Sequence, residues 1–230
     1  MGSTLTWRQP PERRPRRHGE RVSVGRGRLR LDGYLAHSDR SGPGVLVLHE
    51  SFGLQQSFID LSDRLAGEGF TAFAPDLYGG RMAASIEEAA ALADGLDPEL
   101  TRRRLAEAAA HLRANWHPRL GAIGFSSGAA HATALGDEPG LDALVVYYGL
   151  GDLTGVRSGT PVLGHFATGD HHEPVDAVRA AFAGRPEAEL CLYDGVGHWF
   201  ANSSVGDAYD AATAEAAYGA TLEFLRYHLS

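Results

Sequence analysis

The sequence predicts an α/β fold with a mostly parallel central sheet flanked by helices. Short, uninterrupted apolar runs such as 44–49 and 162–167 are typical of strands covered on both faces. Segments with apolar residues at helical spacing alternate with these runs along the chain. Polar residues with catalytic potential stand just after several runs, at the strand ends where parallel sheets collect their chemistry.

Length and composition predict one domain. The 230 residues, 43% of them hydrophobic, are enough to bury one sizeable core, which we assign to 21–230. Residues 1–20 are rich in arginine and proline, and we expect a flexible tail there. Because the sequence has neither an apolar run of transmembrane length nor an apolar segment after the basic N-terminus, we expect a cytoplasmic protein.

The charged residues and the single cysteine exclude several function classes. All 21 basic residues are arginine, so a P-loop lysine and a Schiff-base lysine are both absent. Cys191 alone can form neither an internal disulfide nor a cysteine-built zinc site. Residues 1–30 carry a net charge of about +7 and the remainder about −15. The body is therefore not expected to bind nucleic acid or a membrane, although a basic arm contacting an acidic partner stays an alternative for the tail.

The expected elements follow from these patterns in chain order. Residues 22–36 alternate well enough for two strands, with turn points at 25–27 and at Gly33. A C-terminal helix carries a stripe expected to face the core, at Ala212, Ala216, Gly219, Leu222, Leu225 and Leu229. We predict strands at 44–49, 70–74, 120–124, 141–148, 162–167 and 188–193, and helices at 57–67, 85–95, 99–116, 127–135 and 174–183.

The stretch 124–128, Gly-Phe-Ser-Ser-Gly, has the strand–turn–helix context of a nucleophile elbow. Its glycines suit a turn so sharp that side chains at Gly124 and Gly128 would collide with neighbouring backbone. This spacing makes Ser126 the candidate nucleophile. Ser127 supplies a backbone N–H at the start of the following helix, where an oxyanion could be held.

Three candidate groups occur in the order Ser126, Asp170, His198, which is the order of the α/β-hydrolase arrangement. His198 would take the serine proton, and Asp170 would fix the imidazole tautomer and stabilise its cation. For Asp170, a helix N-cap is the alternative, with Glu173 or Asp152 as a rival acid.

Other roles stay open for the histidines. His198 could be a turn residue, and the group His165, His171, His172 and Glu173 invites a metal interpretation. We favour no metal, because adjacent loop histidines point apart.

From about Gly44 onward the chain resembles the dienelactone hydrolase family, the carboxymethylenebutenolidases. That resemblance implies an α/β-hydrolase without a large lid domain that cleaves lactones or small esters through a covalent acyl-enzyme, with Ser126, Asp170 and His198 as its triad. The matching segments are Val-Leu-His-Glu-Ser-Phe-Gly-Leu (47–54), Ala-Pro-Asp-Leu-Tyr-Gly (74–79), Gly-Phe-Ser-Ser-Gly (124–128), Tyr-Tyr-Gly (147–149), Gly-Asp-His-His-Glu-Pro (169–174) and Gly-His-Trp-Phe-Ala (197–201).

The resemblance also implies roles for Glu50, which matches a family glutamate that contacts the resting nucleophile, and for the Ser51 N–H, which matches the second oxyanion donor beside that of Ser127. The family's founding members carry cysteine at the elbow. Because serine does not ionise readily, we expect His198 to be the sole base and Glu50 to bond the serine hydroxyl or a substrate group, unless Glu50 is only a surface acid at a strand end.

A second departure concerns the substrate. Similar dienelactone hydrolases hold a substrate carboxylate with two arginines; Arg81 stands one residue from the first place, and Asn202 occupies the second. Losing one arginine removes a charge-assisted hydrogen bond worth roughly 1.5–3 kcal/mol. We therefore expect a neutral or larger lactone or ester. The substrate-binding candidates are Phe52, Arg81, Tyr147, Trp199, Phe200 and Asn202.

The leading hypothesis is a serine hydrolase that needs no cofactor, acts on a small-molecule ester or lactone, and is a monomer or weak homodimer. The same scaffold could instead serve acyl transfer, lyase or cyclisation and ring-opening chemistry in a biosynthetic pathway. A non-catalytic binding module is the third hypothesis. The full set of Ser126, Asp170 and His198 disfavours it, because a binding role does not need all three.

Overall fold

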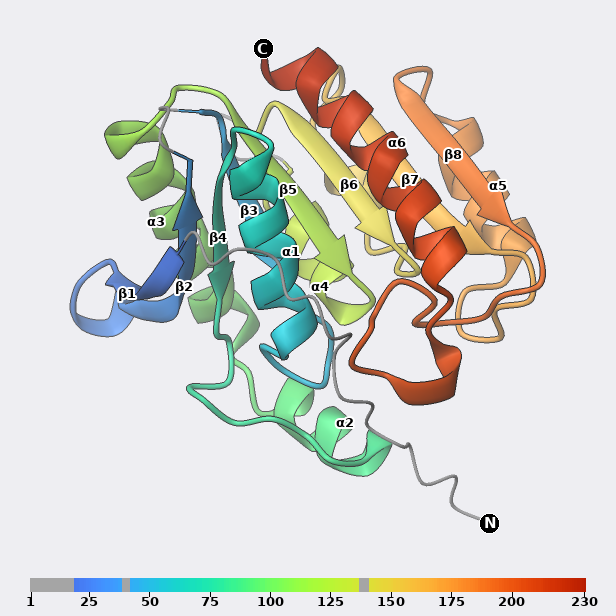
Figure 1. The fold of residues 1–230 in the computed structure, drawn as a ribbon, viewed down its shortest axis with the longest axis horizontal. Helices are drawn as coiled ribbons and strands as arrows, with labels where there is room; N and C mark the ends of the chain where they lie inside the picture. Colours follow the sequence, from blue (N-terminus) through green and yellow to red (C-terminus); the bar gives the residue numbers. More distant parts are fainter. Residues whose placement is uncertain (1–18, 39–41, 137–140) are drawn as a thin grey trace.

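The computed structural model describes residues 19–38, 42–136 and 141–230, and the expected tail at 1–18 lies outside these residues. Eight strands form one sheet in the order β1-β2-β4-β3-β5-β6-β7-β8. The strands from β4 to β8 pair in parallel, and β1 and β2 are antiparallel. The predicted mostly parallel sheet is therefore confirmed (Figure 1).

The strand bounds agree closely with the apolar runs. The strands are β1 (Gly19–Val24), β2 (Leu31–His37), β3 (Gly44–Leu48), β4 (Thr71–Pro75), β5 (Leu120–Phe125), β6 (Ala143–Tyr147), β7 (Val162–Ala167) and β8 (Ala188–Tyr193). All residues of β3 to β7 are buried, as their uninterrupted apolar composition requires.

One predicted turn point is wrong. Gly33 lies inside β2, paired with Val22 and Pro75, and the hairpin turns instead around the short 3-10 helix Gly27–Leu29. Close approach explains the glycine, because a Cβ at Gly33 would lie 2.6 Å from a Phe73 ring carbon and from the Ala74 carbonyl oxygen. Here glycine marks tight packing between strands.

Helices cover both faces of the sheet (Figure 1). On one face α1 and α6 pack over a core that includes Phe58, Val145 and Leu225. On the other face α3, α4 and α5 pack over a second core that includes Leu105, Ala129 and Phe182. The helices are α1 (Gln56–Gly67), α2 (Ile86–Asp94), α3 (Pro98–Asn115), α4 (Ser127–Thr133), α5 (Val175–Ala183) and α6 (Ala211–Leu229).

The predicted inward stripe of α6 is correct only in its C-terminal half. Leu222, Leu225 and Leu229 are buried, whereas Ala212 and Ala216 are exposed. The N-terminal half buries a neighbouring face, at Ala217, Tyr218 and Thr221. The first turns of α6 are rich in alanine, whose hydropathy distinguishes the two faces of a helix only weakly. The sequence there does not determine which face turns toward the core.

None of the described helices combines the length and the apolar character needed to span a membrane.

Candidate active site

Ser126 lies in the sharp turn between β5 and α4, with a φ of 49° that is rare for a residue with a side chain. The flanking glycines make this turn possible. A Cβ at Gly124 would lie 2.6 Å from the Ala129 Cα, and one at Gly128 would lie 2.3 Å from the Leu48 carbonyl oxygen. The collision anticipated from the motif is therefore present at both positions.

The structure brings Ser126, His198 and Asp170 together from three loops at the carboxyl edge of the parallel strands. The Nε2 of His198 lies 2.9 Å from the Ser126 Oγ, and its Nδ1 lies 2.7 Å from an Asp170 carboxylate oxygen. With Asp170 accepting from Nδ1–H, Nε2 is left free to accept the serine proton. This geometry fits proton transfer from a nucleophilic hydroxyl.

Asp170 is held by more than the histidine. Its Oδ1 accepts from the backbone N–H groups of His172 at 2.8 Å and Glu173 at 3.4 Å, while the N-cap position of α5 is Pro174. Burial alone would raise the pKa of Asp170, but the hydrogen bonds and the charge of His198 outweigh it and lower the pKa. The carboxylate is therefore ionised beside the imidazole.

Of the rival acids, Glu173 accepts from the Leu150 N–H at 3.0 Å, and Asp152 accepts from Thr154. The histidines of the metal interpretation also have separate surroundings. His165 bonds Tyr193 and Thr221, whereas His172 lies with its ring 4.8 Å from that of His198.

Two serines border the nucleophile. Ser127 is the first residue of α4, so its N–H precedes the first intrahelical hydrogen bond. Ser51 follows β3, and its hydroxyl donates to the Ser127 Oγ at 3.0 Å. Both residues line the same cavity as Ser126, so their backbone N–H groups are candidate oxyanion donors.

This catalytic cavity has a volume of about 350 Å³ and largely apolar walls. Phe52 and Trp199 contribute rings whose centroids are 5.9 Å apart. The helix α2 adds Ile86, Ala89 and Ala90. Among the described lining residues Glu173 is a carboxylate and none is an arginine, so a bound carboxylate would meet no guanidinium group there.

Glu50 follows β3 and is completely buried. Its Oε1 accepts from the Asn202 amide at 2.7 Å, and the same amide donates to Gln55 at 2.9 Å. The carboxyl group also interacts with the buried Tyr148 hydroxyl, although its other oxygen forms no hydrogen bond of normal geometry with a described residue. Burial raises the pKa of Glu50 to about 8, which the hydrogen bond from Asn202 opposes only in part. The carboxyl group is therefore mostly protonated at neutral pH.

Comparison with known proteins assigns this chain to a family. The model of the dienelactone hydrolase family matches residues 31–229. The chain belongs to that family. Protein usf of Aquifex pyrophilus is 28% identical over 92% of this chain and 100% of its own. A carboxymethylenebutenolidase of Pseudomonas sp. strain P51 is 31% identical over 80% of this chain and 84% of its own.

Solved structures agree with the fold. A dienelactone hydrolase from Anabaena variabilis superposes with a TM-score of 0.73 at 21% identity, over 95% of this chain and 100% of its own. Family and fold together show a hydrolase of the α/β-hydrolase type. The resemblance stated from the sequence motifs is thus confirmed.

The substrate-binding candidates of this dienelactone hydrolase family member lie in different places. Phe52 and Trp199 line the catalytic cavity. Arg81 is exposed, and Phe200 is completely buried in the core beneath α6. Tyr147 and Asn202 are buried and line a different cavity, described below.

Sequence reasoning missed several residues of the catalytic cavity. It assigned no role there to the α2 residues, and it considered His172 only as a metal ligand. The serine N-cap at Ser85 identifies the start of α2. Nothing in the local pattern says that this helix turns its alanines toward the nucleophile, because that depends on tertiary packing.

Proposed function

We propose that this protein is a serine hydrolase that cleaves a lactone or small carboxylic ester through an acyl-serine intermediate. The observation that supports it most directly is the pair of contacts from His198, 2.9 Å to Ser126 and 2.7 Å to Asp170. Neither contact is needed for the fold of an α/β sheet, and both are needed to activate a hydroxyl group.

In the proposed reaction the Ser126 Oγ attacks the acyl carbonyl carbon while the Nε2 of His198 takes the serine proton. The backbone N–H groups of Ser51 and Ser127 would hold the tetrahedral oxyanion. Collapse breaks the bond to the leaving alkoxide, which receives the proton from His198; in a lactone this alcohol stays tethered. Water, deprotonated by His198, then attacks the acyl-serine; the acyl–Oγ bond breaks, the acid leaves, and His198 returns the proton to the Ser126 Oγ.

Proton transfer is assigned to His198 alone. A protonated Glu50 bonded to Asn202 is a poor base, which agrees with a serine rather than a cysteine nucleophile. We assign Glu50 to holding the loop that carries Ser51, one residue along the chain.

The proposed substrate is uncharged in its acyl part. Apolar walls from Phe52, Ile86 and Trp199 favour such a group, and the described lining offers no arginine to hold a carboxylate. A panel of lactones and aryl esters, each with and without a free carboxylate, tests this point. Higher kcat/KM for the carboxylate-bearing members would contradict it.

A fluorophosphonate probe tests the nucleophile. Wild type should be labelled, and Ser126→Ala should lose both labelling and esterase activity. Ser127→Ala is the matched control, since it removes a hydroxyl from the same cavity and leaves the backbone N–H in place. Labelling that survives in Ser126→Ala would overturn the proposal.

A further inference from the structure

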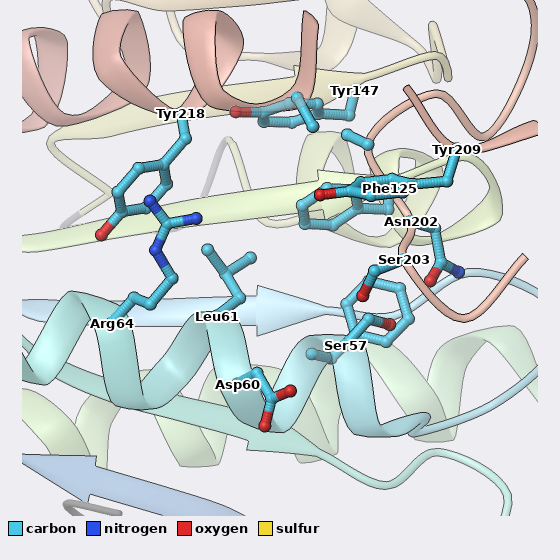
Figure 2. A pocket seen from close by; sticks show the side chains of 13 residues that line it. Ser57, Asp60, Leu61, Arg64, Phe125, Tyr147, Asn202, Ser203, Tyr209 and Tyr218 are labelled. Carbon is cyan, nitrogen blue, oxygen red and sulfur yellow. The ribbon is translucent and has the colours of Figure 1, made fainter. Parts of the chain in front are cut away.

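A second cavity of about 350 Å³ lies on the face of the sheet that α1 and α6 cover. Its walls are aromatic: Phe125 and Tyr147 come from β5 and β6, Tyr209 from the loop before α6, and Tyr218 from α6 itself (Figure 2). No residue that lines it is also among those lining the catalytic cavity. The two cavities are therefore separate sites.

The hydroxyl groups around this cavity differ in whether a ligand could reach them. The side-chain oxygens of Ser57 and Tyr218 are buried and form no hydrogen bond with any described residue, and Tyr218 is only 6% exposed. These two oxygens have almost no accessible surface, so a ligand in the cavity would meet instead the hydroxyl of Tyr209, a half-buried residue of the lining. Figure 2 shows the Tyr209 hydroxyl reaching across the cavity toward Leu61 and Tyr218.

The charges at the cavity do not favour an anion, because its arginine is paired and its Asp60 carboxylate accepts a hydrogen bond from a neutral amide. Arg64 donates to both carboxylate oxygens of Glu215 at 2.9 Å and lies 3.7 Å from the Tyr218 ring centroid. Asp60 accepts from the Gln56 amide at 2.7 Å. Among the described lining residues there is thus no unpaired cation to attract an anion, and a carboxylate would lose hydration without compensation.

We propose that this cavity is a binding site for an uncharged, phenol-like aromatic molecule, distinct from the catalytic centre. Flat rings on several sides suit an aromatic ligand, and the Tyr209 hydroxyl suits a single polar substituent. The cavity also contacts Asn202 and Ser203, which follow His198 on one loop. A bound ligand packs against the loop that carries the catalytic histidine.

Calorimetric titration with 4-methylphenol tests the site. Ala214 lines the cavity from α6, so Ala214→Phe fills it; Ala216→Phe adds the same ring on the exposed side of the same helix. Ala90→Phe narrows the catalytic cavity instead. We expect Kd to rise at least tenfold in Ala214→Phe and to stay within about twofold in the other two variants. The anion 4-methylbenzoate should bind wild type at least tenfold more weakly.

A second variant keeps the test independent of how well Ala214→Phe folds. Tyr209→Phe removes one hydroxyl and should weaken 4-methylphenol about threefold to tenfold while leaving toluene binding unchanged. The inference is overturned if 4-methylphenol shows no saturable binding up to about 10 mM, if only Ala90→Phe weakens it, or if 4-methylbenzoate binds as tightly. None of these readouts requires catalysis, so the outcome is independent of the proposed function.

Discussion

Replacing Glu50 by glutamine should make the protein more stable at neutral pH. The side chain is completely buried, and its Oε1 accepts from Asn202. Glutamine has nearly the shape of a protonated glutamate and keeps the accepting oxygen, so the hydrogen bond survives. The substitution removes a carboxyl group whose ionisation in the folded state costs free energy.

The size of the effect follows from proton linkage. The pKa of Glu50 is about 8 in the folded protein against an ordinary value of 4.5. Between these values the folded state holds a proton that the unfolded chain has released, so stability is lost as the pH rises, by about 1.4 kcal/mol per pH unit. The loss ends above the folded pKa. From pH 5 to pH 7.5 the wild type should therefore lose about 3 kcal/mol relative to Glu50→Gln.

Urea unfolding of both proteins at pH 5, 6, 7 and 7.5 measures this difference. The two free energies of unfolding should be similar at pH 5 and diverge steadily, with Glu50→Gln the more stable. Glu223→Gln, which alters an exposed glutamate of α6, is the control and should show no such divergence. A constant difference across this range would refute a buried, protonated Glu50. Unchanged esterase rates in Glu50→Gln would also exclude the residue from the chemistry.

Further predictions concern the neighbouring residues. Asp170→Asn should lower kcat by roughly 10⁴-fold, because the amide would favour the wrong tautomer of His198; a loss below tenfold in steady-state assays would argue for another acid. Gly128→Ala places a methyl group 2.3 Å from a backbone carbonyl oxygen and should lower the free energy of unfolding by about 1–3 kcal/mol, seen as a lower urea midpoint. Asn202→Asp sets a second carboxyl beside Glu50 and should make stability fall more steeply with pH than in wild type; parallel pH profiles would count against it.

Most of the fold could be predicted because the parallel strands have a recognisable apolar composition, in the buried β7 and also in the half-buried β8. The run at 162–167 and the run at 188–193 match β7 and β8 without error, since both begin and end at changes of composition. The structural roles of the glycines were harder to predict. Gly124 and Gly128 have a motif around them, whereas the contact of Gly33 with the Phe73 ring depends on a strand forty residues away in the chain, which local pattern cannot reveal.

The positions of the candidate triad were predictable for a related reason. Each of Ser126, Asp170 and His198 closely follows a strand, and parallel strands end at one edge, so the topology brings them together. Which residues line each of the two cavities was not predictable in this way. Trp199 could be placed because it adjoins His198. Tyr147 faces the α1 side from its place at the end of β6, and Asn202 reaches that side because the loop after β8 folds back.

Asn202 lets burial determine the protonation of Glu50, because it brings a hydrogen bond without a charge. An arginine at this position would place a cation beside Glu50 and favour its ionised form. The asparagine amide divides its hydrogen bonds between Glu50 and Gln55 and brings no charge, so burial determines the state of the carboxyl group. With an asparagine at this position, no cation stands beside Glu50 and the buried acid stays protonated. Asn202 does not line the catalytic cavity, where the proposed function leaves apolar contacts with Phe52 and Trp199 to select the acyl group.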